Sequence, residues 1–176
     1  METNLDQRYV NDCQARIQQL VSRDFKQSTG LPEGCLLSDL TEIGVQIKEG
    51  EGVARLGQRK TNFRMLVVEG YEHAVRVWLA AEKVLLLDVK YPQIDPDLPT
   101  LVAQWGEPAA KLGSYLGTLL LPESEWVYPQ RGVTLFINPK NNILLRLAVY
   151  PPTTLESYQE RLRLNLQRKR LPQRRR

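Results

Sequence analysis

The residues best suited to chemistry are an aspartate and a lysine that end an apolar segment. Asp88 and Lys90 follow the run 84–87, and the two-residue period of a strand places both side chains on one face. A carboxylate beside an ammonium group can hold a metal ion and activate water. The same pair is also common at a solvated strand end, where charges keep sheet edges from pairing. The pattern predicts either a catalytic pair or a charged strand end.

A neighbouring strand is expected to bring two more polar residues toward this pair. If the predicted hairpin places residue 79 opposite residue 84, then His73 faces Lys90 and Glu72 lies beside them. This register predicts an acidic, a basic and an imidazole group at one end of the hairpin.

An acid beside an Asp-x-Lys strand resembles the core of the PD-(D/E)xK nucleases. That resemblance implies a divalent metal held by carboxylates and a lysine that polarises the attacking water. It implies Glu72 or Glu69 as the first carboxylate, Asp88 as the second and Lys90 as the ammonium group.

The remaining catalytic inventory is small. His73 is the only histidine, and Cys13 and Cys35 have no CxxC partner, so the common zinc ligand sets are absent from the sequence. The sequence contains no GxxxxGK[ST] or GxSxG motif. Two cysteines predict reduced thiols, with Cys13 in the core. These observations favour a protein that is not an enzyme and has no cofactor or metal.

Positive charge is concentrated at the end of the chain. The net charge is +4, but residues 161–176 contain eight Arg or Lys and no acid. A run of this kind can bind nucleic acid, an anionic membrane or an acidic partner, or it can be a solvated helix end. The candidate anion-binding residues are Arg161, Arg163, Arg168, Lys169, Arg170, Arg174, Arg175 and Arg176.

Five aromatic residues allow two interpretations. They could line a ligand groove on a sheet, or they could belong to the core, and the small number of aromatics in the chain favours the core. Strand spacing places two of them on one face. The residues are Trp78, Trp105, Trp126, Tyr128 and Phe136, and the pair that shares a face is Trp126 with Tyr128.

Hydrophobic periodicity predicts an α+β fold with antiparallel strands. Helices are expected over 4–27, over 98–105 and from Thr153, where Thr153 and Glu156 have capping-box spacing. The expected strands cover 43–48, 63–67, 74–79, 84–90, 115–121, 125–128, 132–137 and 143–150.

Two segments of the chain have similar patterns. Residues 74–92 and 133–151 each give a strand, a short turn, a strand and a closing Tyr-Pro. A short helix or turn precedes each of them, at 37–44 and at 98–106. We therefore expect one domain over 1–160, with similar halves at 31–94 and 95–152, followed by a basic helix end and tail at 161–176.

Two family resemblances rest on the second half of the chain. The segment 98–150, with LVAQWGEP, EWVY, GVTLFI and ILLRLAVY, resembles the BamE/SmpA module and the β-lactamase-inhibitor-protein-like fold. That resemblance implies a non-catalytic module that binds other proteins. The segments QWGEPAAKL, EWVYPQRGVTLFINP and YPPTTLESYQERL resemble a family of uncharacterised conserved proteins of cyanobacteria, which implies no activity.

By elimination, the sequence favours a soluble, cytoplasmic, non-enzymatic module that binds another protein. The first alternative is nucleic-acid binding through the basic tail, which predicts an affinity that falls steeply with salt. The second alternative is the metal-dependent nuclease. No apolar run approaches the length of a membrane span, and the polar N-terminus predicts no secretory signal.

Overall fold

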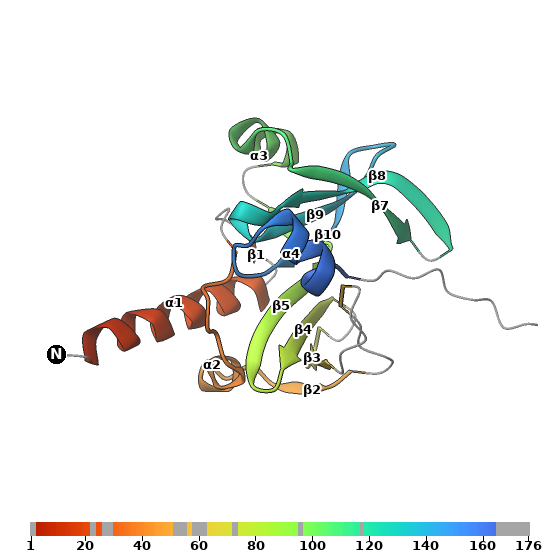
Figure 1. The fold of residues 1–176 in the computed structure, drawn as a ribbon. Helices are drawn as coiled ribbons and strands as arrows, with labels where there is room; N and C mark the ends of the chain where they lie inside the picture. The colour runs from red at the N-terminus through yellow and green to blue at the C-terminus, as the bar shows by residue number, and fades with distance from the viewer. Residues whose placement is uncertain are drawn as a thin grey trace, which may run out of the picture.

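The computed structural model describes residues 3–21, 24–25, 30–50, 56–57, 63–71, 74–94, 97–116 and 118–164. In these ranges, eight strands form one antiparallel sheet, and helices pack on it (Figure 1). The predicted α+β class with an antiparallel sheet is confirmed. None of the helices in these ranges is long and apolar enough to cross a membrane.

The eight strands have the spatial order β2-β3-β4-β5-β10-β9-β8-β7. Their bounds are β2 Ile47–Glu49, β3 Arg64–Val68, β4 Val75–Ala80, β5 Lys83–Lys90, β7 Ala110–Leu116, β8 Leu119–Tyr128, β9 Val133–Asn138 and β10 Ile143–Val149. A separate parallel pair joins β1 (Asp24–Phe25) to β6 (Gln93–Ile94). The helical segments are α1 Thr3–Val21, α2 Leu37–Glu42, α3 Leu98–Trp105, the 3-10 turn η1 Pro129–Arg131, α4 Leu155–Ser157 and the π-helix η2 Tyr158–Leu162.

The sheet consists of two meanders that meet at its centre. Strands β2 to β5 follow one another in space, strands β7 to β10 do the same, and β5 pairs with β10. The short helix α2 precedes the first meander, and α3 precedes the second. The segment 37–44, for which the sequence allowed a helix or a turn, contains α2.

The two faces of the sheet cover separate cores. Along β5, Leu87 and Val89 enter the first core and Leu86 enters the second, because successive residues of a strand point to opposite faces. The first core joins the sheet to α1, α2 and α3, and the second joins it to the C-terminal segment. The second core contains Leu56, Met65, Trp78, Leu86, Val127, Phe136, Ala148, Tyr150, Tyr158 and Leu164.

Both predicted terminal helices are shorter in the structure. The N-terminal helix ends at Val21 instead of residue 27, because the chain leaves α1 to form the parallel pair β1–β6. The hydrophobic periodicity that predicted this helix is confirmed at Cys13, Ile17, Leu20 and Val21, which are buried. The other apolar positions of that pattern, Leu5, Tyr9 and Phe25, have side chains outside the described part of the structure.

The C-terminal helix is a single turn that continues into the π-helix η2. Thr154 caps it by accepting a hydrogen bond from the Ser157 N–H at 3.1 Å, so the predicted cap at Thr153 is wrong. Helical structure ends at Leu162, and Leu164 then forms a bridge with Leu56. Of the predicted helix end and tail at 161–176, the described part is helical only to Leu162, and residues 165–176 lie outside the described ranges.

Candidate functional site

The hairpin β4–β5 forms as predicted, but its register changes along its length. Leu79 is opposite Val84 as expected, whereas Trp78 is opposite Leu86. One residue of β5 is therefore left unpaired between these two pairs. Such a β-bulge shifts all later pairs by one position.

The bulge changes the strand register that the sequence predicted near Lys90. Lys90 donates its backbone N–H to the Ala74 carbonyl at 2.7 Å, so the predicted register, in which His73 faces Lys90, is wrong. His73 and Glu72 themselves lie outside the described residues.

Asp88 is not the solvated strand end that the charged-edge interpretation required. Strand β5 lies between β4 and β10 in the middle of the sheet, and Asp88 is 1% exposed. The Nε of Arg146 on β10 lies 3.2 Å from Asp88 Oδ1, and this ion pair crosses the seam between the two meanders. No residue in the described part of the chain donates a hydrogen bond to either carboxylate oxygen of Asp88.

Burial controls the ionisation of Asp88. Loss of hydration raises the pKa of its carboxyl group, and the positive charges of Arg146, Arg76 and Lys90 oppose that rise. The described surroundings of Asp88 are therefore basic. A nuclease centre needs a carboxylate that a metal ion and water can reach. Asp88 is buried, so neither can reach it.

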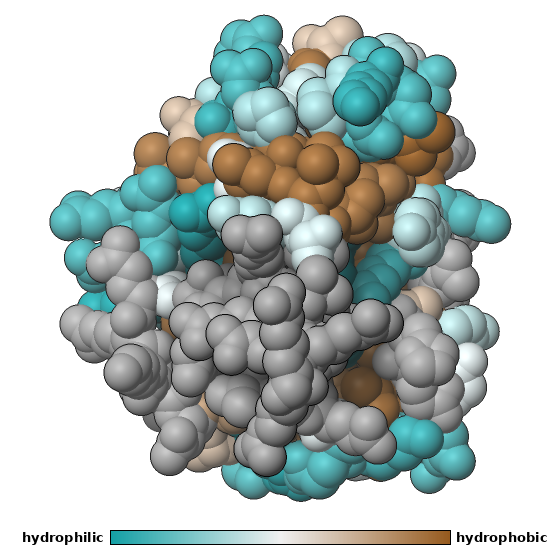
Figure 2. Space-filling model, turned by 90° about the vertical axis from the view of Figure 1, so that its right-hand side faces the viewer, coloured by the Kyte–Doolittle hydropathy of each residue, from teal (hydrophilic) through white to brown (hydrophobic). Residues whose placement is uncertain are grey.

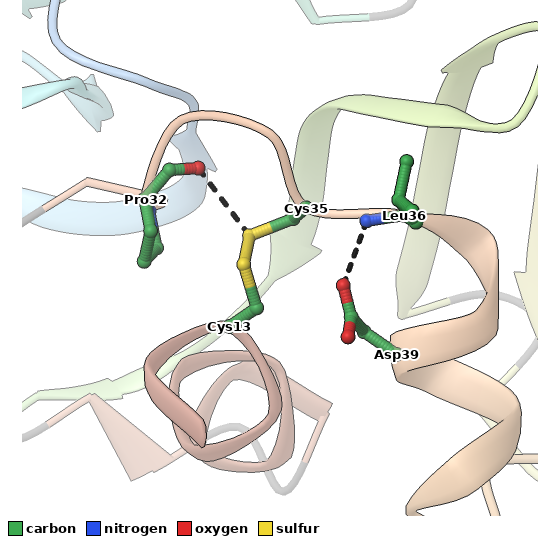
Figure 3. The surroundings of a disulfide bond; sticks show 5 residues. All are labelled: Cys13, Pro32, Cys35, Leu36 and Asp39. Carbon is green, nitrogen blue, oxygen red and sulfur yellow. Dashed lines mark hydrogen bonds between the residues drawn. A yellow bond between two sulfur atoms is a disulfide. The ribbon is translucent and has the colours of Figure 1, made fainter. Parts of the chain in front are cut away.

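Among the described residues, one group of three side chains has the spacing of metal ligands. It consists of Cys13, Cys35 and Asp39, all of them buried. Cys13 and Cys35 form a disulfide, however, and Asp39 accepts a hydrogen bond from the Leu36 N–H at 2.7 Å (Figure 3). The sulfur atoms of this group are bonded to each other instead of being open to an ion.

The disulfide corrects the prediction of reduced thiols. It connects Cys13 in α1 to Cys35, which precedes α2. The Cys35 carbonyl accepts a hydrogen bond from the Val84 N–H at 2.8 Å, so the linked segment also lies against the start of β5. The two cysteines are far apart in sequence, and only the packing of α1 beside this segment brings them together.

The five predicted aromatic residues do not form one groove. Trp78 and Phe136 belong to the second core, whereas Tyr128 belongs to the first core. Trp126 and Trp105 pack against the first core, so the predicted shared face of Trp126 and Tyr128 is confirmed. Because the aromatics lie on both faces of the sheet, the core interpretation holds and the groove interpretation is wrong.

The basic residues near the C-terminus differ in their surroundings. Arg161 is exposed, whereas Arg163 forms an ion pair with the buried carboxylate of Glu125 at 2.9 Å. The remaining six candidate anion-binding residues fall within 165–176, outside the described residues. The Arg163 guanidinium is engaged inside the fold.

The root of the hairpin β7–β8 contains this buried carboxylate. Glu125 on β8 is 1% exposed, and the Tyr158 hydroxyl donates to its Oε1 at 2.7 Å. Arg163 donates from Nε and Nη2 to the same carboxylate at 2.9 to 3.2 Å. Arg163 Nη2 also donates to the Gly113 carbonyl on β7 at 2.9 Å. One arginine thus binds both strands of the root.

The electrostatics of the root follow from burial and proximity. Burial, followed by the charge of Glu125, raises the pKa of Tyr158 well above its ordinary range. Burial lowers the pKa of Arg163, whereas its hydrogen bonds and ion pair with Glu125 raise it. The second effect is larger, so the pKa of Arg163 is raised. Tyr158 is therefore a neutral donor and Arg163 a permanent cation.

Two serines mark the end of the root. Leu112 is opposite Glu125, but Ser114 is opposite Leu121, so three residues of β8 face a single residue of β7. The hydroxyl oxygens of Ser114 and Ser124 lie 2.6 Å apart, and Ser124 donates to the Leu121 carbonyl at 2.7 Å. Such an irregularity bends a ribbon, and these bonds hold the bend.

Beyond the serines, the hairpin is apolar and exposed. Tyr115, Leu116, Leu119 and Leu120, which we call the tip, are 36%, 51%, 55% and 52% exposed. Tyr115 is opposite Leu120, and Leu116 is opposite Leu119, so each face of the ribbon carries one of these pairs. Figure 1 shows the hairpin extending to one side, and Figure 2 shows an apolar band across that side of the molecule.

The tip was not expected from the sequence, because the apolar residues of 115–121 predict a single strand. In the structure, this segment contains the end of β7, a turn and the start of β8. The available signal was Gly117-Thr118 between two apolar pairs, since Gly-x is a common two-residue hairpin loop.

Comparisons with known proteins identify no relative. No family model, curated protein or solved structure matches the chain. The resemblances to the BamE/SmpA module and to the cyanobacterial family stay predictions.

Proposed function

We propose that this protein is a non-enzymatic docking module whose binding element is the tip of the hairpin β7–β8. One observation carries the proposal: four apolar side chains, two on each face, extend from a root that is fixed by polar bonds to the buried Glu125 carboxylate. Exposed apolar surface is unfavourable in water unless a partner covers it, so a contiguous apolar patch is typical of an interaction site. The sequence favoured a protein-binding module, and the exposed tip is the surface that supports this function.

The test compares the wild-type chain with a variant carrying Leu119→Ser and Leu120→Ser, one substitution on each face of the tip. Ile143→Ser is the matched control, because Ile143 is 51% exposed at a different turn. A tagged chain is followed by sedimentation of a native lysate. We expect the wild type and the control to migrate in large assemblies and the tip variant to migrate as a monomer. Identical profiles for all three proteins would overturn the proposal.

Nucleic-acid binding through the basic tail is the alternative from the sequence. Its test needs a truncation after Leu164, because removal of Arg163 would also release the hairpin root. A salt-dependent affinity that disappears on this truncation would support the alternative. The nuclease alternative is disfavoured because Asp88 is buried and ion-paired.

The disulfide weighs against the cytoplasmic location expected from the sequence, because the cytosol normally keeps thiols reduced. Alkylation of Cys13 and Cys35 in fresh lysate, before and after reduction, tests the location. Labelling before reduction would support a reducing compartment. Labelling only after reduction would indicate an oxidising one.

A further inference from the structure

The arrangement of the tip restricts what can cover it. Tyr115 and Leu120 lie on one face of the ribbon, and Leu116 and Leu119 lie on the other. A partner with a flat binding surface would cover one face and leave the second in water. An occupant that surrounds the ribbon removes all four side chains from water, as the interfacial region of a lipid bilayer does.

The composition of the tip also suits a bilayer interface. Three leucines supply apolar area without charge, and Tyr115 combines an apolar ring with a hydroxyl group. Tyrosine is enriched at the level of lipid headgroups for this reason. The tip therefore has an apolar end for the hydrocarbon boundary and an amphipathic ring for the headgroup layer.

The root holds the tip away from the body of the protein. Arg163 binds Glu125 on β8 and the Gly113 carbonyl on β7, and the serine pair follows directly along the ribbon. These contacts fix the base of the hairpin without covering its end. A projecting hairpin with a fixed base can enter a lipid surface while the sheet stays outside it.

The chain beyond the root supplies charge complementarity. Arg163 contacts β7 directly, and the next residue, Leu164, is the last one described. The twelve residues that follow contain six Arg or Lys and no acid. Basic segments beside an apolar anchor are attracted to anionic lipids, and two such signals together give stable attachment where one is marginal.

We infer that this protein attaches peripherally to an anionic membrane surface, with the β7–β8 tip inserted at the interface. This inference rests on the proposed docking function and assigns its partner as lipid instead of another protein. The described helices lack a membrane span, and the attachment needs none, because the hairpin enters only the interface.

The test is co-sedimentation of the full chain with two kinds of vesicle. One contains phosphatidylcholine alone, and the other contains phosphatidylcholine mixed with phosphatidylglycerol. We expect binding to the anionic vesicles that weakens as salt rises. The Leu119→Ser, Leu120→Ser variant is expected to bind at least about tenfold more weakly, whereas Ile143→Ser binds like the wild type.

A second variant separates the contribution of the positive charge to vesicle binding from that of the hairpin. It carries glutamine in place of Arg168, Lys169, Arg170, Arg174, Arg175 and Arg176. We expect this variant to lose the preference for anionic vesicles. Thermal unfolding of each variant, followed by circular dichroism, confirms that the fold is retained.

Three results would overturn the inference. The first is failure of the wild type to bind either vesicle, and the second is binding that is unaffected by the tip substitutions. The third is loss of large assemblies in lysate by the tip variant, with no wild-type binding to vesicles. In that third case the docking function stands and its partner is a protein.

Discussion

The root and the tip of the hairpin β7–β8 reverse the usual distribution of residue types. At the root, the charged residue Glu125 is buried, whereas at the tip leucines are exposed. The buried charge is matched by Arg163 and Tyr158, which donate hydrogen bonds to it. The described structure contains no comparable cover for the exposed leucines. The comparison assigns the two regions different roles: buried polar bonds at the root stabilise the fold, and the exposed tip is the surface at which we propose binding.

The largest effect is expected from breaking the root. Glu125→Gln removes the charge but keeps the shape, and leaves Arg163 half-buried without its anionic partner. We expect the free energy of unfolding to fall by about 3 to 4 kcal/mol, since breaking a buried ion pair is strongly destabilising. Urea unfolding measures the change. Glu123→Gln is the control, because Glu123 is exposed on the same strand, and an equal loss in both variants would refute the role of the root.

The second prediction compares the loss of stability at the root with the loss caused by removing the disulfide. Cys13 and Cys35 are separated by 22 residues, and a loop of this size predicts a loss of about 3 kcal/mol when both become alanine. Urea unfolding of the double variant, compared with the wild type treated with reductant, checks this value. An unchanged midpoint in both samples would show that the bond contributes nothing to stability.

Asp88 provides a second buried carboxylate, but one to which none of the described residues donates a hydrogen bond. Burial raises the pKa of Asp88 in the folded state above its value in the unfolded state. Its favourable contribution to the free energy of unfolding is therefore fully present below the unfolded-state pKa, and is lost as the pH rises through the folded-state pKa. We therefore expect the stability of the wild type to decline relative to Asp88→Asn as pH increases across that window. Urea unfolding at a series of pH values tests this, and parallel curves for the two proteins would contradict it.

The smallest effect on stability is expected at the tip. The Leu119→Ser, Leu120→Ser variant should unfold within about 0.5 kcal/mol of the wild type, because both side chains are exposed in the folded chain. The same variant is expected to lose docking, so stability and binding separate. A large fall in stability in urea would show that the tip packs on the protein itself.

The sequence predicted local features well where periodicity and turn chemistry decide them. The helix expected over 98–105 is α3, Leu98–Trp105, and the apolar residues of α1 from Cys13 to Val21 are buried as hydrophobic periodicity indicated. The hairpins β4–β5 and β9–β10 lie where alternating apolar residues placed them. These features depend on neighbours in sequence, whose geometry is nearly fixed by the backbone.

The candidate site was less predictable because its parts come from distant segments. A single bulge in β5 gives Lys90 other cross-strand neighbours than the regular hairpin register predicted. No residue type in that strand indicates a bulge. Arg163 looked like part of a basic tail, but folding brings it to Glu125, 38 residues earlier in the chain. The apolar run 115–121 gave no indication that its side chains would be left uncovered.

The sequence by itself determined the α+β class, the antiparallel hairpins and the excess of positive charge near the C-terminus. Composition and short-range periodicity carry that information. Only the tertiary structure decided that Asp88 is buried at a seam, that Cys13 meets Cys35, and that the tip is exposed. The physical reason is that burial and pairing depend on which segments pack together. The same leucine stabilises a core when another element covers it, and is left exposed to solvent when none does.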